Sequence, residues 1–420
     1  MVTSVWKADF AARTRESQID PRKGRTCKRL QGLGVGSASR NHVSCGNRQN
    51  GAWGGRPQER KASRMNESKR RYTIKDIAEQ SGVSLSTVSL VLNDNPRISQ
   101  TTRARVLETI ERLGYQPNRM ARALAWRHTR TLAVLVPQLR HAFADVYFGE
   151  IVSGIYDRAS RLGYKILLEV ARNEFIEGKE YRQLYDQKFV DGIMFIGANS
   201  RHRFVSELTD GSRPFLLVNN YSKEFDLNYV VSNYRYGAWQ AAKHLVRLGH
   251  KRIGMITGGV SEIQTSQDIV EAFGEVLDDS GIGTDPNLIV DGWLTEEGGM
   301  KAAEELLRQN PEVTAIFSLN DKMALGAIKK LNELGLRVPQ DVAVVGFDDI
   351  PQASFAIPGL TTVHQPLYEI GKLACERMVE LIHGKVSRVQ EVIPIYLTVR
   401  ESCGARLQGA VVAPAAAPAV

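Results

Sequence analysis

Apolar runs of strand length recur along most of the chain. Between them lie stretches whose apolar residues are spaced as on a helix, and strands alternating with helices imply a parallel sheet covered on both faces. Seven such runs are many for one doubly wound sheet, so the pattern predicts an α/β body of two lobes within residues 131–404. The predicted strands are TLAVLVP (131–137), YKILLEV (164–170), GIMFIG (192–197), PFLLVN (214–219), RIGMITG (252–258), AIFSLN (315–320) and VAVVGFDD (342–349).

A different pattern, of three short helices, precedes this body. Thr73, Ser84 and Ser99 are good N-cap residues, and each precedes a segment with apolar residues at helical spacing. Gly82 and Gly114 end the first and third helices. The residues expected to face inward are Ile74, Ile77, Ala78, Val88, Val91, Leu92, Val106, Ile110 and Leu113.

Charge is unevenly divided along a chain of ordinary globular composition, with 43% hydrophobic and 24% charged residues among 420. Residues 1–64 hold 14 basic and 4 acidic residues, residues 65–130 hold 12 and 6, and the remainder holds 29 and 36. A basic N-terminal module on a mildly acidic body is typical of a nucleic-acid reader joined to a sensor. A solvated basic tail is the alternative that charge alone leaves open.

The two ends of the chain differ from the segments beside them. Residues 1–64 are rich in Gly, Arg, Ser and Asn and show no sustained apolar period, so we expect a disordered basic extension. It is either a mis-called upstream start, with Met65 as the natural one, or a genuine tail that adds non-specific DNA affinity. Residues 405–420 are rich in Ala and Pro, and we expect them to be disordered as well.

Several classes of protein are disfavoured. No apolar run approaches the ~18 residues of a membrane span, and the first residues lack the apolar core of a signal peptide. Cys27, Cys45, Cys375 and Cys403 match no metal site and no disulfide framework, which predicts a reducing compartment. GxSxG, Walker and HExxH patterns are absent, so we expect no catalytic residue, no metal and no cofactor.

The strongest motif is TIKDIAEQSGVSLSTVSLVLN, residues 73–93, followed by ISQTTRARVLETIERLGYQPNRMARALA. These strings resemble the DNA-binding domain of the lactose-repressor (LacI/GalR) family, and a looser resemblance continues to about Glu401. It implies a three-helix helix-turn-helix DNA-binding head (residues 65–116), a hinge helix and linker (117–130), and a two-lobed periplasmic-binding-protein-like (Rossmann-like) body. A protein of this family would be a transcriptional regulator, here expected to be a repressor, in the cytoplasm at the nucleoid.

The resemblance also assigns DNA contacts. We expect a homodimer on a pseudo-palindromic operator in double-stranded DNA, because two heads are needed across one site. Leucine packs on a thymine methyl group but makes no bidentate bond to guanine, so the half-site should be read partly by apolar contact. The positions that face base edges are Leu85, Ser86, Ser89 and Leu90. Those that touch phosphates and fix register are Thr73, Thr87, Asn93, Ser99, Thr102, Arg103 and Asn118.

The segment Pro117–Ala125 matches the family's hinge helix. Leu124 occupies the family's minor-groove wedge position, and Ala121 is small enough for two such helices to pack closely. A leucine pushed between base steps unstacks them and kinks the DNA. The alternative is a plain linker helix, which the intact motif disfavours.

In the body, the resemblance implies an effector cleft between lobe one (about 131–232 and 364–394) and lobe two (about 233–363 and 395–404). Polar residues at the carboxyl ends of parallel strands point into such a crevice, and facing aromatics can stack on a sugar ring or a base. Asp321 is expected to be a helix N-cap instead. The predicted effector-binding residues are Tyr147, Phe148, Asn219, Trp293, Asn320, Asp348 and Gln365.

One position departs from the family pattern. Sugar-responsive relatives carry an arginine where this chain has Ile269, and an aliphatic side chain makes no forked bond to hydroxyls or a carboxylate. The effector, a sugar or related metabolite, could therefore be unusual or bound differently, or a protein partner could control the regulator. Activation in place of repression also stays open. A transporter's solute-binding protein is disfavoured by the DNA-binding motif and by the absence of a signal peptide.

Overall fold

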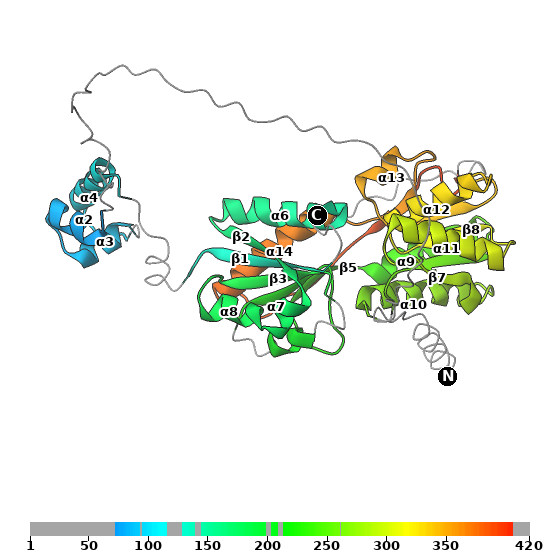
Figure 1. The fold of residues 1–420 in the computed structure, drawn as a ribbon, viewed down its shortest axis with the longest axis horizontal. Coiled ribbons are helices and arrows are strands. Elements are labelled where there is room, and N and C mark those ends of the chain that lie inside the picture. Colours follow the sequence, from blue (N-terminus) through cyan, green and yellow to red (C-terminus); the bar gives the residue numbers. More distant parts are fainter. Residues whose placement is uncertain are drawn as a thin grey trace, which may run out of the picture. The chain divides into compact units, whose positions relative to one another are not determined.

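The computed structural model describes residues 72–92, 95–115, 128–138, 144–198, 203–208, 213–260 and 262–405. These fall into two compact units, within residues 72–115 and 128–405 (Figure 1). Outside them lie the predicted extension 1–64, the tail 406–420, most of the hinge segment 117–130, and the predicted DNA contacts Asn93, Asn118, Ala121 and Leu124.

The smaller unit is a three-helix bundle of α2 (Ile74–Ser81), α3 (Leu85–Leu92) and α4 (Gln100–Leu113). Its core holds Ile77, Ala78, Val88, Val91 and Val106, and the other four predicted inward residues pack against them. Gly82 and Gly114 end α2 and α4 in the left-handed conformation, with φ of 63° and 60°. The helix pattern and the core predicted for this unit are therefore confirmed.

The larger unit contains two six-stranded sheets, one in each lobe. In lobe one the strand order is β11-β5-β4-β3-β1-β2, and all five pairs of neighbours are parallel. Its strands are β1 (Thr131–Pro137), β2 (Lys165–Ala171), β3 (Gly192–Ile196), β4 (Phe215–Val218), β5 (Tyr229–Ser232) and β11 (Gln390–Ile393). Alternate residues of β1 enter different cores: Leu132 and Val134 lie in one, and Ala133 and Leu135 in the other.

Helices cover both faces of the lobe-one sheet. One core includes residues of α6 and α14, and the other includes residues of α7, α8 and η2. The elements are α6 (Val146–Arg161), α7 (Asn173–Glu177), α8 (Glu180–Asp186), η2 (Arg203–Leu208) and α14 (Leu367–Ile382).

Lobe two repeats this plan with strand order β12-β10-β9-β8-β6-β7, in which only β12 is antiparallel to its neighbour. The strands are β6 (Ile253–Thr257), β7 (Ile289–Asp291), β8 (Ala315–Ser318), β9 (Ala343–Asp348), β10 (Thr361–His364) and β12 (Tyr396–Thr398). Figure 1 shows α11 and α12 on one side of this sheet and α9 and α10 on the other. The helical elements are α9 (Tyr234–Arg247), α10 (Gln264–Asp279), η3 (Pro286–Leu288), α11 (Glu296–Gln309), α12 (Asp321–Glu333) and α13 (Pro351–Phe355).

The chain passes between the lobes three times, after β5, after β10 and after β11. All seven predicted strands are present within a residue or two of their predicted bounds, and the two-lobed α/β class is confirmed. Five strands of three or four residues each, β5, β7, β10, β11 and β12, were not predicted. None of the helices in the described ranges is long and apolar enough to cross a membrane.

Two facing glycines bring α6 and α14 into close contact. A Cβ atom added at Gly154 would lie 2.0 Å from the carbonyl oxygen of Tyr368, and one at Gly371 would lie 2.1 Å from that of Ile151. Both obstacles are backbone atoms, so a side chain at either position forces the helices apart.

We therefore expect Gly154→Ala to lower the free energy of unfolding of the body by about 1–3 kcal/mol. Gly149→Ala, in the same helix, is the matched control, because no atom lies within 4 Å of its added Cβ. The control should be neutral or stabilising by up to about 1 kcal/mol. Urea unfolding followed by circular dichroism measures both, and equal stabilities of the two variants would contradict the close-packing argument.

Candidate functional site

The predicted base-reading residues lie on the outward face of α3. Leu85 is 43% exposed, Ser86 is exposed, and Ser89 and Leu90 are half-buried. The opposite side of the helix contributes Val88 and Val91 to the core. The helix is therefore held by its apolar side while two leucines and two serines are presented to solvent.

Several predicted phosphate-contacting side chains cap helices. Thr73 forms a capping box with Asp76 at the start of α2, and the Ser99 hydroxyl accepts the backbone N–H of Thr102 at 3.2 Å at the start of α4. The hydroxyl of Thr87 lies 2.9 Å from that of Ser84, at the start of α3. Exposed helix N-termini with hydroxyl caps suit a phosphate anion, because the helix dipole and the free N–H groups favour negative charge.

The larger unit gathers its predicted polar residues where strands end. Asn219 follows β4, Asn320 follows β8, Asp348 ends β9 and Gln365 follows β10. All four side chains are buried, with 2–9% of each residue exposed. The backbone near these strand ends is also strained, because non-glycine residues there have positive φ: 51° at Asn219, 54° at Trp293 and 118° at Asp348.

A hydrogen-bonded chain runs through these residues from one lobe to the other. The amide nitrogen of Asn219 donates to Gln365 Oε1 and to the Tyr147 hydroxyl, both at 2.9 Å. Gln365 Nε2 in turn donates to Asp348 Oδ1 at 2.7 Å. The hydroxyls of Tyr147 and Tyr234 lie 3.3 Å apart. The structure thus brings together four of the predicted effector residues, Tyr147, Asn219, Asp348 and Gln365.

Burial controls the charge of this cluster. It raises the pKa of Asp348 well above the ordinary value, and repulsion from Asp321 raises it further. Burial likewise raises the pKa values of the Tyr147 and Tyr234 hydroxyls. These hydroxyls stay protonated at neutral pH, so the cluster offers neutral donors and acceptors of the kind that bind hydroxyl groups.

The other three predicted residues have different settings. Asn320 accepts the backbone N–H of Met323 at 2.8 Å, so its amide oxygen caps α12. Trp293 is 65% exposed and takes no part in the polar chain described above. Phe148 is 8% exposed and belongs to the lobe-one core, with its ring edge-on to Tyr147.

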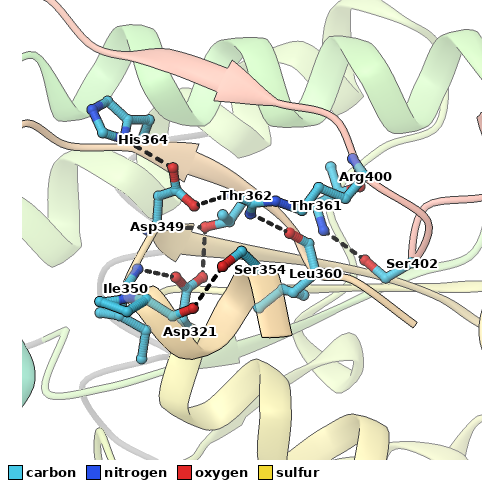
Figure 2. Close-up of polar contacts among 11 residues, drawn as sticks. Asp321, Asp349, Ile350, Ser354, Leu360, Thr361, Thr362, His364, Arg400 and Ser402 are labelled. Carbon is cyan, nitrogen blue, oxygen red and sulfur yellow. Dashed lines mark hydrogen bonds and ion pairs between the residues drawn. The ribbon is translucent and has the colours of Figure 1, made fainter. Parts of the chain in front are cut away.

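The expectation that Asp321 caps a helix is wrong. Asn320 is the N-cap, and Asp321 is the first residue of α12, fully buried. Its carboxylate accepts the Thr362 hydroxyl at 2.5 Å and the backbone N–H of Ile350 at 2.9 Å (Figure 2). Burial raises its pKa to about 7.

Asp349 lies beside this buried carboxyl in a more polar setting. Its two oxygens pair with His364 Nδ1 at 2.9 Å and with Arg400 at 2.6 Å (Figure 2). Burial opposes ionisation of Asp349, but these two hydrogen bonds outweigh it and lower its pKa. Adjacent carboxyls at the end of β9 are therefore pushed in opposite directions, Asp348 towards the neutral form and Asp349 towards the charged form.

Sequence reasoning did not identify Tyr234 or the pair Lys322–Asp145. Tyr234 begins α9 directly after the chain leaves lobe one, and only its hydroxyl reaches the polar chain. Lys322 Nζ lies 2.5 Å from Asp145 Oδ2 and joins α12 of lobe two to the start of α6 in lobe one. A lysine next to a predicted strand end was the one available signal for this pair.

A helix-turn-helix unit joined in one chain to a two-lobed body with a polar interlobe site defines the class of DNA-binding regulators that carry their own sensor. Residues 73–118 match the bacterial regulatory proteins of the lacI family, and residues 242–403 match a periplasmic binding protein-like domain. The chain belongs to the LacI family of bacterial transcriptional regulators.

Individual relatives match over most of their length. The chain is 36% identical over 304 residues to catabolite control protein A of Priestia megaterium, which covers 72% of this chain and 90% of the relative. It is 31% identical to the transcriptional repressor PurR of Aliivibrio salmonicida, over 78% of this chain and 97% of the relative. The lac repressor dimer bound to operator and an anti-inducer is similar at a TM-score of 0.70 and 27% identity, over 80% of this chain and 99% of that one.

The buried carboxyl of Asp321 makes stability depend on pH. A native pKa of about 7, above the ordinary 3.8, means that the folded state binds this proton more tightly than the unfolded state. Its contribution to stability is present below the ordinary pKa and is lost as the pH rises through the native value. Wild-type protein should therefore lose stability from about pH 4 to pH 7, by at most about 1.4 kcal/mol per pH unit for this group.

Asp321→Asn should flatten that decline, because an amide has no proton to lose and can still accept from Ile350 and meet the Thr362 hydroxyl. Melting temperatures measured between pH 5 and pH 8 test this. Asp341→Asn is the control: Arg337 lowers the pKa of this exposed carboxyl to about 2, so removing it should alter only the acid side of the profile. Parallel wild-type and Asp321→Asn profiles would show that Asp321 does not titrate in this range.

Proposed function

We propose that this protein is a homodimeric transcriptional repressor whose affinity for a pseudo-palindromic operator is changed by a small-molecule effector, a sugar or related metabolite, bound between the two lobes. It would act in the cytoplasm at the nucleoid, and it would carry out no catalysis. The observation that carries the proposal is the presence in one chain of an outward-facing recognition helix and a buried polar interlobe cluster. The solved complex of the transcriptional regulator CelR with cellobiose, which is similar to this chain at 31% identity and a TM-score of 0.61, supports a sugar as the class of effector.

The direct test is selection of bound fragments from genomic DNA by the purified full chain. Enrichment of short palindromes is expected, and the genes beside them would indicate the effector. Uniform, salt-sensitive binding without an enriched motif would contradict a sequence-specific role, because phosphate contacts alone give that behaviour.

The leucines of α3 should contribute to specificity. Leu85→Ala and Leu90→Ala are each expected to weaken binding to the selected operator by roughly 5- to 30-fold, or about 1–2 kcal/mol, through lost apolar contact with the bases. Leu107→Ala on α4 is the control, because Leu107 is 48% exposed but lies outside the predicted base-reading set. Fluorescence anisotropy on matched duplexes measures all three, and an equal loss for Leu107→Ala would remove α3 as the reading element.

Exposed apolar residues on the body support association of two copies. Phe355 and Ile357, at the end of α13, are 84% and 91% exposed, and Tyr156 on α6 is 60% exposed. Exposed apolar side chains that lie together mark an interaction surface, and Phe355 and Ile357 are only two positions apart in the chain. Phe355→Glu combined with Ile357→Glu should shift the protein from dimer to monomer in sedimentation velocity and weaken operator binding. Leu334→Glu, at a position 48% exposed beyond α12, should stay dimeric; a dimeric double variant would place the interface elsewhere.

A further inference from the structure

A carboxylate of lobe two accepts most of its hydrogen bonds from lobe one. Asp268, in the second turn of α10, has a side chain that is 4% exposed. It accepts the Tyr221 hydroxyl at 2.7 Å, Lys223 Nζ at 2.9 Å and Gln264 Nε2 at 3.3 Å. Tyr221 and Lys223 lie in the loop that follows β4, so two of these three bonds cross from lobe to lobe.

These bonds depend on the lobes being close together. A buried carboxylate that loses its donors keeps the full cost of desolvation, so separating the lobes either leaves Asp268 unsatisfied or exposes it to water. Lys223 is 53% exposed and contributes weakly, as surface ion pairs do. The less exposed Tyr221 hydroxyl is the stronger partner, and both burial and the neighbouring carboxylate raise its pKa, so it remains a donor.

A second ion pair crosses between the lobes on the other side of the sheets. Lys322 of α12 pairs with Asp145 at the start of α6, with side chains 26% and 13% exposed. In Figure 1, α6 and α12 lie on the upper side of the two sheets and α10 lies on the lower side. The lobes are thus bridged on both sides, in addition to the three chain connections.

The residue that follows Asp268 in α10 is apolar. Ile269 is 3% exposed and packs inside lobe two, so it offers no polar group to the other lobe or to a ligand. The adjacent carboxylate is already satisfied by lobe one. This turn of α10 therefore binds lobe one.

We propose that the Tyr221–Asp268–Lys223 bridge, together with the Lys322–Asp145 ion pair on the opposite side of the sheets, holds the lobes closed without an effector. Asp268 is then a positioning residue that sets the resting geometry of the cleft. The consequence of this bridge for regulation rests on the proposed function, because an effector would then bind to lobes that the bridge already holds closed. The closure itself can be tested without DNA or effector, so its failure is distinguishable from failure of the proposed function.

The experiment is hydrogen exchange of backbone amides, followed by mass spectrometry, on the full chain without ligand. Asp268→Asn should accelerate exchange roughly tenfold on both walls of the cleft, in the loop 219–228 and in the first turns of α10, since one charged hydrogen-bond acceptor is lost. Acceleration should extend to the connections between the lobes, at residues 232–234 and 364–367. Tyr221→Phe removes one hydroxyl and should give the same pattern more weakly.

The chain supplies a matched control. Glu207 accepts the Tyr181 hydroxyl at 2.5 Å and pairs with Lys179 and Arg182, so it is a carboxylate with the same kinds of partner, all within lobe one. Glu207→Gln should accelerate exchange only near α8 and η2. The proposal is overturned if Asp268→Asn accelerates exchange in α10 alone, or if Glu207→Gln affects both walls equally.

Discussion

The side-chain amide of Gln365 is bonded to both lobes at once. It accepts from Asn219 of lobe one and donates to Asp348 of lobe two, and all three residues are less than a tenth exposed. A buried polar group must be paired, so the polar residues of each lobe complete the hydrogen bonding of those in the other lobe. The same constraint explains why the chain connections run beside this cluster, because Gln365 directly follows β10 where the chain returns to lobe one.

This constraint also explains how the site could be recognised in the sequence. Parallel strands with apolar interiors are visible as continuous apolar runs, and the first polar residue after each run is placed by the fold at the sheet edge. Asn219, Asn320 and Asp348 could be predicted on that basis. Tyr234 and Asp268 could not, because each follows a loop or connection whose path depends on tertiary packing. The ion pair of Lys322 with Asp145 joins residues 177 positions apart, so the position of the lysine after a strand gave no indication of its partner.

The five strands that were missed have a common physical reason. Each has only three or four residues. Exposed and half-buried positions alternate in β11, and all three residues of β12 are half-buried. Their conformation is fixed by pairing with a neighbouring strand, as when β11 pairs with β5 through Gln390 and Tyr229. The error over which of Asn320 and Asp321 caps α12 has a similar origin. Both residue types cap helices well, and Asp321 is distinguished by tertiary contacts with Thr362 and Ile350.

The polar groups that remain for a ligand are mostly neutral. Lys322 and Lys223 are each paired with a carboxylate of the opposite lobe, and Ile269 replaces the arginine expected from the family resemblance. Asp348 is driven towards its protonated form by burial and by Asp321, so it can donate as well as accept. Amides, hydroxyls and a protonated carboxyl match the alternating donors and acceptors of a polyhydroxylated molecule better than they match an anion. The chemistry of these described residues is therefore compatible with the proposed effector of the sugar class, and Asn219, Asp348 and Gln365 remain its predicted contacts.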